Sequence, residues 1–295
     1  MTGSGLSTSA MARRESFVTG SDGKLIVVGT PIGNRGDFSP RAEEALRGAD
    51  TVCAEDTRVT GRLLSLLGIE AHLERCDENV IANRAPQLVE RIAGGEVIAF
   101  CSDAGMPAVS DPGAVLVDAC REAGLPVEVV PGPTAVATAI AASGFATTAF
   151  FFGGFLPRKS AERCRLLEGL SDLDACLAFY ESPHRTAAAL ADIAKVLPAR
   201  QVCLCRELTK LHEEVLRGPA PQVARQVAER GDLKGEVVLV VGPPAADEGR
   251  IDPRGPATQA RAQELLDTGM SPSRAAKALA AELGVSKNAV YDLFH

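Results

Sequence analysis

Six short segments of the chain are rich in Gly, Pro or charged side chains. They are GTPIGN (29–34), AEDTR (54–58), SDAGMP (102–107), PGPTA (131–135), YESPHR (180–185) and RELTK (206–210). Each lies at the end of a short apolar run that is typical of a buried strand. Ligands of open α/β sheets bind beyond the carboxyl ends of the strands, where Gly and Pro let backbone amides approach them. One such segment is ordinary turn chemistry, whereas six of them indicate a ligand site.

Missing motifs exclude several other chemistries. The sequence contains no G-x-x-x-x-G-K-[ST], no G-x-G-x-x-G after a strand, no H-E-x-x-H and no G-x-S-x-G. The four His residues lack metal-ligand spacing, and the eight Cys residues form no C-x-x-C. We therefore expect reduced, buried thiols and no metal, with a zinc site as the alternative, and Cys203 and Cys205 on one strand face. These residues predict a ligand site between α/β lobes but do not identify the ligand.

The elements that must position these segments are strands alternating with helices. Seven apolar runs predict strands, over residues 25–30, 51–56, 97–105, 127–132, 176–182, 202–208 and 236–242. Their apolar character on both faces indicates sheets covered by helices on both sides, which is an α/β fold. Ser39-Pro40 and Asp111-Pro112 predict helix starts, Gly124 predicts a stop, and residues 134–143 predict a helix of small side chains.

The composition divides the chain into five parts. We predict a disordered tail (1–23), an N-terminal lobe (24–132), a C-terminal lobe (133–244), a Pro/Gly-rich linker (245–256) and a helix-turn-helix unit (257–295). The tail lacks the apolar run of a signal peptide and no stretch is long enough to span a membrane, so we expect a cytoplasmic protein.

Charge and aromatic content restrict the nucleic-acid partners. A net charge of −7, no Trp and two Tyr argue against coating of long naked nucleic acid. Lys287 is the sole cation on the predicted recognition helix of the C-terminal unit, so we expect no sequence-specific DNA binding.

From about Leu25 to Gly242 the chain resembles the tetrapyrrole-methylase-fold enzymes. The motifs GTPIGN, AEDTR, SDAGMP with the following SDPG, PGPTA, GFLPRK, FYESPHR and RELTK occur in the order typical of the ribosomal RNA cytidine 2′-O-methyltransferase family. Met106 stands where Thr is more usual. The resemblance implies two α/β lobes with an interlobe cleft that binds S-adenosyl-L-methionine, and a homodimer. It also implies a cytidine ribose in the decoding region of 16S rRNA, in the small ribosomal subunit, as the substrate.

The resemblance also implies which residues line the cofactor site. They are Pro31, Ile32, Gly33, Asp103, Ala104, Gly105, Pro133, Thr134, Ala135, Phe179 and Tyr180. The alternative for Asp103 is that it caps the following turn. Phe179 and Tyr180 either pack against the adenine or fill the core.

Methyl transfer from a sulfonium is an in-line displacement, so positioning supplies much of the rate. A ribose hydroxyl also gains from a nearby proton acceptor or from a cation that stabilises the alkoxide. The candidates are Glu55, Asp56, Arg58, Glu181, His184, Glu207 and Lys210. The alternative is ion pairs at strand ends, such as Arg58 with Glu55 or Lys210 with Glu207.

The run LPRKSAERCR (156–165) is a candidate RNA-binding surface. Arg158, Lys159, Arg163 and Arg165 outweigh Glu162 there, and the alternative is a solvated helix face. Two other functions remain open: methylation of a corrin or porphyrin precursor, and a DNA-binding regulator whose lobes sense a metabolite. The basic run and the appended helices favour RNA over a small macrocycle.

Overall fold

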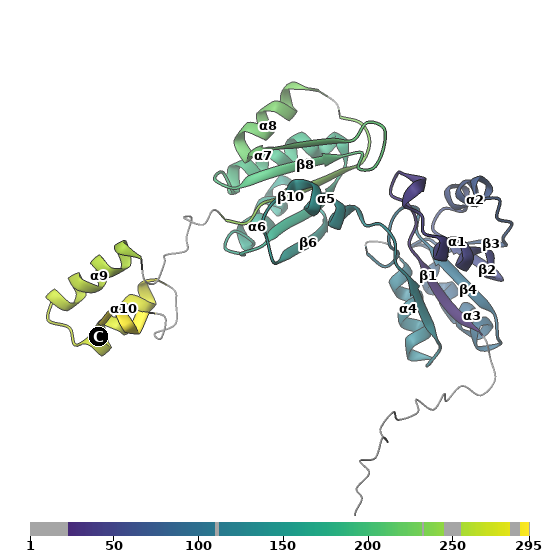
Figure 1. Ribbon diagram of the computed structural model, residues 1–295, viewed down its shortest axis with the longest axis horizontal. Coiled ribbons are helices and arrows are strands. Elements are labelled where there is room, and N and C mark those ends of the chain that lie inside the picture. The colour runs from purple at the N-terminus through teal and green to yellow at the C-terminus, as the bar shows by residue number, and fades with distance from the viewer. Residues whose placement is uncertain (1–22, 110–111, 232, 245–254, 284–289, 295) are drawn as a thin grey trace, which may run out of the picture. The chain divides into compact units, whose positions relative to one another are not determined.

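The computed structural model describes residues 23–109, 112–231, 233–244, 255–283 and 290–294 (Figure 1). The chain divides into two compact units between Ala135 and Val136, named unit 1 and unit 2 below. The predicted tail and most of the predicted linker lie outside the described residues.

Unit 1 contains a five-stranded sheet with the order β3-β2-β4-β1-β5, in which every neighbouring pair is parallel. Its strands are β1 (Lys24–Val28), β2 (Thr51–Ala54), β3 (Leu73–Arg75), β4 (Val97–Cys101) and β5 (Val127–Val130). Four of them confirm predicted strands. The sequence analysis missed β3, because its three residues, Leu-Glu-Arg, include no buried side chain.

Helices cover both faces of this sheet, as predicted. They are α1 (Pro40–Arg47), α2 (Thr57–Leu66), α3 (Ile81–Ala93) and α4 (Gly113–Glu122), with a short 3-10 turn, η1 (Arg35–Asp37). Ile26 and Val28 pack with residues of α1 and α2, whereas Leu25 and Val27 pack with residues of α3 and α4. Ser39 caps α1 by accepting a hydrogen bond from the amide of Ala42 at 3.1 Å.

Unit 2 contains a mixed sheet with the order β6-β7-β10-β8-β9. Its strands are β6 (Phe150–Phe155), β7 (Cys176–Glu181), β8 (Gln201–Arg206), β9 (Glu214–Pro219) and β10 (Val237–Val241). Strand β6 runs parallel to β7, and β10 runs antiparallel to both β7 and β8. The carboxyl ends of β6, β7 and β8 therefore share one edge, at which β10 begins.

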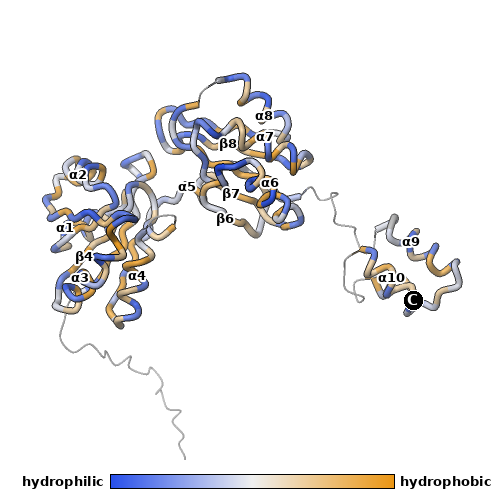
Figure 2. Tube along the Cα trace, turned by 180° about the vertical axis from the view of Figure 1, so that it is seen from behind, coloured by the Kyte–Doolittle hydropathy of each residue, from blue (hydrophilic) through white to orange (hydrophobic). Residues whose placement is uncertain are grey.

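The unit 2 sheet is also covered on both faces. The helices are α5 (Ala135–Ser143), α6 (Ser160–Gly169), α7 (Thr186–Val196) and α8 (Ala220–Glu229), with a 3-10 turn, η2 (Pro183–Arg185). The main core joins α6, α7 and α8 to alternate strand residues such as Phe179 and Leu239. On the other face Arg217 donates a hydrogen bond to the carbonyl of Ser143, at the end of α5. In unit 1 the trace is strongly hydrophobic around β4 (Figure 2).

The sequence analysis missed β6 and β9. Two glycines interrupt β6, and residues of β9 alternate between exposed and half-buried.

All eight cysteines are free and seven are buried, as predicted. The sulfurs of Cys203 and Cys205 lie 3.7 Å apart on one face of β8, which was also predicted.

The C-terminal helices α9 (Pro256–Asp267) and α10 (Pro272–Glu282) pack with the 3-10 turn η3 (Tyr291–Phe294) around a small core that includes Leu265 and Leu279. A third helix was predicted here, but residues 284–289, with Lys287, lie outside the described part. No helix in the described ranges has the length and hydrophobicity that a membrane span requires.

Candidate active site

Three loops interlock at the carboxyl edge of the unit 1 sheet. A Cβ atom on Gly29 would lie 2.6 Å from the Cα and backbone nitrogen of Gly132 and 2.7 Å from the sulfur of Met106. The amide of Gly132 donates a hydrogen bond to that sulfur at 3.1 Å. The loops after β1, β4 and β5 thus touch through backbone, which is possible only because two of the contact positions are glycine.

A second contact fixes the loop after β1 against the loop after β4. Thr30 and Gly105 exchange two backbone hydrogen bonds, at 2.9 and 3.2 Å, and the Thr30 hydroxyl donates to the Ser102 carbonyl at 3.2 Å. Gly105 has a φ of +88°, a conformation that suits glycine. This pairing holds Ile32 against Gly105, where an added Cβ would lie 3.3 Å from the Ile32 side chain.

Asp103 links the ends of β4 and β2. Its carboxylate accepts a hydrogen bond from the amide of Asp56 at 2.9 Å. Partial desolvation raises the pKa of Asp103, the amide hydrogen bond opposes that shift, and the nearby Asp56 carboxylate adds to it. Since Asp103 and Ala104 are exposed, this carboxylate can meet a ligand at the loop edge.

Arg58 pairs with Asp56, at 2.9 Å from Nε to Oδ1, and not with Glu55 as the sequence suggested. Asp56 is also the N-cap residue of α2 and accepts a hydrogen bond from the Arg58 amide. The hydrogen bonds from Arg58 lower the pKa of Asp56 below its usual range. Arg58 remains 89% exposed in this pair.

The other residues predicted at the cofactor are spread over this edge. Ile32 is buried, Gly33 is exposed, and the remainder are half-buried: Pro31, Pro133, Thr134 and Ala135. Two predicted cofactor residues, Phe179 and Tyr180, lie instead in β7 of unit 2. Phe179 is fully buried in the main core of that unit, whereas Tyr180 is half-buried on the opposite face of the strand.

Glu181 ends β7 and is the most buried of the predicted catalytic side chains. Its Oε1 accepts a hydrogen bond from the amide of Ser182 at 2.7 Å and forms an ion pair with Arg185. Its Oε2 is buried and has no hydrogen-bond partner, the one such side-chain atom found among the described residues. A buried acceptor without a donor is costly, which is typical of a functional position. Exposed His184 lies in the turn that Glu181 holds.

Glu207 and Lys210 form an ion pair after β8, which was the alternative to a catalytic role in the sequence analysis. Lys210 Nζ lies 2.8 Å from Glu207 and 3.0 Å from Glu236, and Glu207 also accepts a hydrogen bond from the Glu236 amide. Desolvation alone would lower the pKa of Lys210, but the two carboxylates outweigh it and the pKa is raised. The same hydrogen bond from Lys210 lowers the pKa of Glu207. Glu207 and Thr209 both have positive φ, at +52° and +65°, so this loop is strained.

The register of the sheet brings these groups to one edge. Val237, the first residue of β10, pairs with Glu181 on one side and with Arg206 on the other. The structure therefore gathers the segments 180–185 and 206–210 at the edge of the unit 2 sheet. The other four predicted segments lie at the carboxyl edge of the unit 1 sheet.

Arg163 was predicted to contact RNA, but in the structure its side chain is buried. It is 4% exposed, donates to Asp192 of α7 at 2.7 Å, and also donates to the carbonyls of Pro157 and Arg158. A buried guanidinium with these partners is a structural clamp, whereas Arg158 and Lys159 are exposed. The sequence analysis missed Asp192 and Glu236, because nothing in their local sequence shows which side chain they will meet.

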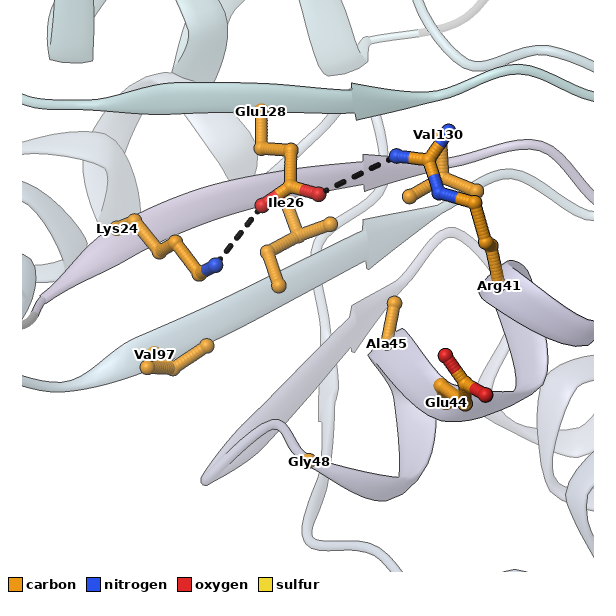
Figure 3. A pocket seen from close by; sticks show the side chains of 9 residues that line it. All are labelled: Lys24, Ile26, Arg41, Glu44, Ala45, Gly48, Val97, Glu128 and Val130. Carbon is orange, nitrogen blue, oxygen red and sulfur yellow. Dashed lines mark hydrogen bonds and ion pairs between the residues drawn. The ribbon is translucent and has the colours of Figure 1, made fainter.

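A pocket of about 280 Å³ lies elsewhere on unit 1, between α1 and the sheet (Figure 3). Within it Glu128 forms ion pairs with Lys24, at 2.8 Å, and with Arg41, at 3.4 Å. The pocket extends to Lys24 and Val97, which begin β1 and β4, so it reaches the edge of the sheet opposite the interlocked loops.

Residues 24–224 match the family Tetrapyrrole (Corrin/Porphyrin) Methylases. This span contains all six predicted ligand-site segments, and the chain belongs to that family. Among similar proteins are several named Ribosomal RNA small subunit methyltransferase I. The one from Halalkalibacterium halodurans is 37% identical over 97% of this chain and 99% of its own length, and the one from Escherichia coli O157:H7 is 42% identical over 92% and 94%.

Solved structures of similar fold include the methyltransferase CobJ, with a TM-score of 0.57 and 22% identity over 75% of this chain and 94% of that one. The cobalt precorrin-4 methyltransferase CbiF has a TM-score of 0.56 and 18% identity over 79% and 98%. Uroporphyrin-III C-methyl transferase from Thermus thermophilus, complexed with S-adenyl homocysteine, has a TM-score of 0.53 and 17% identity over 75% and 97%. These likenesses confirm the predicted two-sheet α/β fold.

Proposed function

We propose that this protein transfers a methyl group from S-adenosyl-L-methionine to the 2′-oxygen of a cytidine ribose in the decoding region of 16S rRNA. The observation that carries the proposal is the identity of about 40%, over more than nine-tenths of the chain, to proteins named Ribosomal RNA small subunit methyltransferase I. The proposal includes the small ribosomal subunit as partner, a homodimer, and a cytoplasmic location.

The interlocked loops of unit 1 fit the cofactor. Backbone packed at Gly29 and Gly132 leaves no room for added side chains, and Gly105 has a positive φ that favours glycine. The three positions form a fixed wall against which a small polar ligand can bind. Exposed Asp103 supplies a carboxylate beside that wall. Bound there, S-adenosyl-L-methionine supplies an electrophilic methyl group on a sulfonium.

The groups at the edge of unit 2 suit the ribose hydroxyl. Lys210, whose pKa is raised, stays protonated and acts as a cation that stabilises the developing alkoxide. Glu207 has a lowered pKa and is a weak base, whereas Glu181 has an oxygen without a donor and is our candidate proton acceptor. His184, on the turn next to Glu181, remains another candidate, as do Glu55, Asp56 and Arg58 in unit 1.

One assay tests the proposal against its alternatives. The full chain is incubated with methyl-labelled S-adenosyl-L-methionine and, separately, with small ribosomal subunits, naked 16S rRNA or a precorrin. We expect label in the ribose of one cytidine, and the first two substrates distinguish assembled subunits from free RNA.

Methylation of a corrin or porphyrin precursor is the second candidate, because the solved structures of similar fold include enzymes named for such substrates. Label in the precorrin and none in RNA would establish it. Label in neither substrate would contradict both functions. Sedimentation of the full chain tests the homodimer.

A further inference from the structure

We propose that the loop Phe155–Lys159, which joins β6 to α6, binds single-stranded RNA, with Phe155 stacking on an unpaired base and Arg158 and Lys159 binding the flanking phosphates. The inference rests on the proposed function, since it assumes that the substrate is RNA. It adds Phe155, as a base-stacking residue, to the exposed cations of the predicted RNA-binding surface. It also gives Arg163 a structural role, which is to hold the loop.

Phe155 is an exposed aromatic side chain in a fixed orientation. It is 61% exposed at the end of β6, where Phe155 pairs in register with Tyr180. Its ring meets the Tyr180 ring edge-to-face at 5.6 Å, and Tyr180 meets Phe152 in the same way at 4.8 Å. A large apolar ring that is exposed to water and packs on its inner side against the Tyr180 ring suits stacking, which proteins use to bind unpaired bases.

Two arginines, buried Arg163 and half-buried Arg185, hold the backbone of the loop. Arg163 donates to the carbonyl of Pro157 at 3.0 Å and to that of Arg158 at 3.3 Å, and Asp192 holds the guanidinium. Arg185 donates to the carbonyl of Leu156 at 3.4 Å and pairs with Glu181. Because three successive carbonyls are bound, the loop is organised before any ligand arrives, which reduces the entropic cost of binding.

The charge of the exposed face suits a polyanion. Arg158 is exposed, and Lys159 is 80% exposed in a surface ion pair with Glu162 at 3.2 Å. Such pairs are worth little, so a phosphate can replace Glu162 at small cost. A two-fold contact of this loop with a second copy would bring like cations together, whereas RNA supplies the opposite charge.

The test compares two phenylalanines of the same strand. Phe155→Ala and Phe150→Ala remove exposed rings, 61% and 54% exposed, from opposite ends of β6. Affinity is measured for a single-stranded fragment of the 16S rRNA decoding region and for the small subunit, with circular dichroism to confirm folding. We expect Phe155→Ala to weaken binding about 5- to 150-fold, Phe155→Tyr to retain it, and Phe150→Ala to leave it unchanged.

The salt dependence separates stacking from charge. Phe155→Ala should leave the slope of log affinity against log salt unchanged, whereas Arg158→Ala should reduce it by about 0.7. Equal affinity of wild type and Phe155→Ala would overturn the proposal, and so would a loss of self-association without a loss of RNA binding. Methylation of RNA by the wild type would leave the proposed function standing in either case.

Discussion

The loops after β1, β4 and β5 in unit 1 meet through backbone, whereas the loops after β7 and β8 in unit 2 are held by charged side chains. In unit 1, Gly29 and Gly132 are in direct contact, and Thr30 pairs with Gly105 through main-chain hydrogen bonds. In unit 2, two ion pairs hold the loops: Glu181 pairs with Arg185, and Glu207 pairs with Lys210.

We propose that this difference reflects two different ligands. A small cofactor can bind against close, fixed backbone with the Asp103 carboxylate beside it. A ribose hydroxyl on a polyanion needs groups that move protons, stabilise negative charge and meet phosphates. We therefore expect substitutions in unit 1 to impair cofactor binding and substitutions in unit 2 to impair transfer.

The largest effect should follow replacement of Lys210 or Glu181 by Ala. Loss of a cation or proton acceptor lowers transfer roughly 100- to 10,000-fold, while cofactor affinity stays nearly unchanged. Single-turnover transfer to small subunits at saturating cofactor measures this, with Lys195→Ala as the control because Lys195 is an exposed lysine on α7. Normal turnover in both variants would remove them from the mechanism.

Arg163→Met should destabilise the protein by about 3–5 kcal/mol, because it leaves Asp192 without its buried partner. Lys159→Met removes only the exposed pair with Glu162 and should cost less than about 1 kcal/mol. Urea unfolding of the full chain compares the two free energies. Equal values would mean that Arg163 does not clamp the loop.

Gly29→Ala should disturb the contact of the three loops in unit 1. The added Cβ, 2.6 Å from the backbone of Gly132, costs about 1–3 kcal/mol in stability. A shift of the loops by about 1 Å lowers transfer on the order of 100-fold. Gly169→Ala is the control, because a Cβ there would meet nothing within 4 Å. Equal transfer rates in the two variants would contradict a role for the loops.

Asp103→Asn should weaken cofactor binding roughly tenfold, as expected for one hydrogen bond to a charged group. It should also change the pH dependence of stability. The pKa of Asp103 is raised in the folded state, so its ionisation removes stability as pH rises through the usual Asp range and above. The melting temperature of Asp103→Asn relative to wild type should therefore increase from acid to neutral pH, and a constant difference would argue against the raised pKa.

The smallest effect should come from Glu207→Gln. Because the pKa of Glu207 is lowered in the folded state, its contribution is present above the usual Glu pKa of about 4.3 and is lost as pH falls through the folded value. The stability difference between wild type and variant, at most about 1 kcal/mol, should shrink below about pH 4. Melting curves at neutral and acid pH measure it.

Local patterns predicted much of this molecule. Seven strands followed from apolar runs, and the start of α1 followed from Ser39-Pro40, because those signals are set within a few residues. Contacts between distant segments could not be predicted in this way. Arg163 was predicted to be a surface cation because its partner Asp192 lies 29 residues away in the sequence. Even for the neighbours of Arg58, the sequence did not show that Asp56 and not Glu55 would bind it.

The most direct test of whether unit 1 binds the cofactor and unit 2 serves the transfer is calorimetry. It measures S-adenosyl-L-methionine binding to wild type, Gly29→Ala and Lys210→Ala. We predict that the wild type and Lys210→Ala bind with nearly the same affinity and that Gly29→Ala binds much more weakly. No binding by the wild type, or equal losses in the two variants, would contradict the assignment of the cofactor to the backbone-built loops of unit 1.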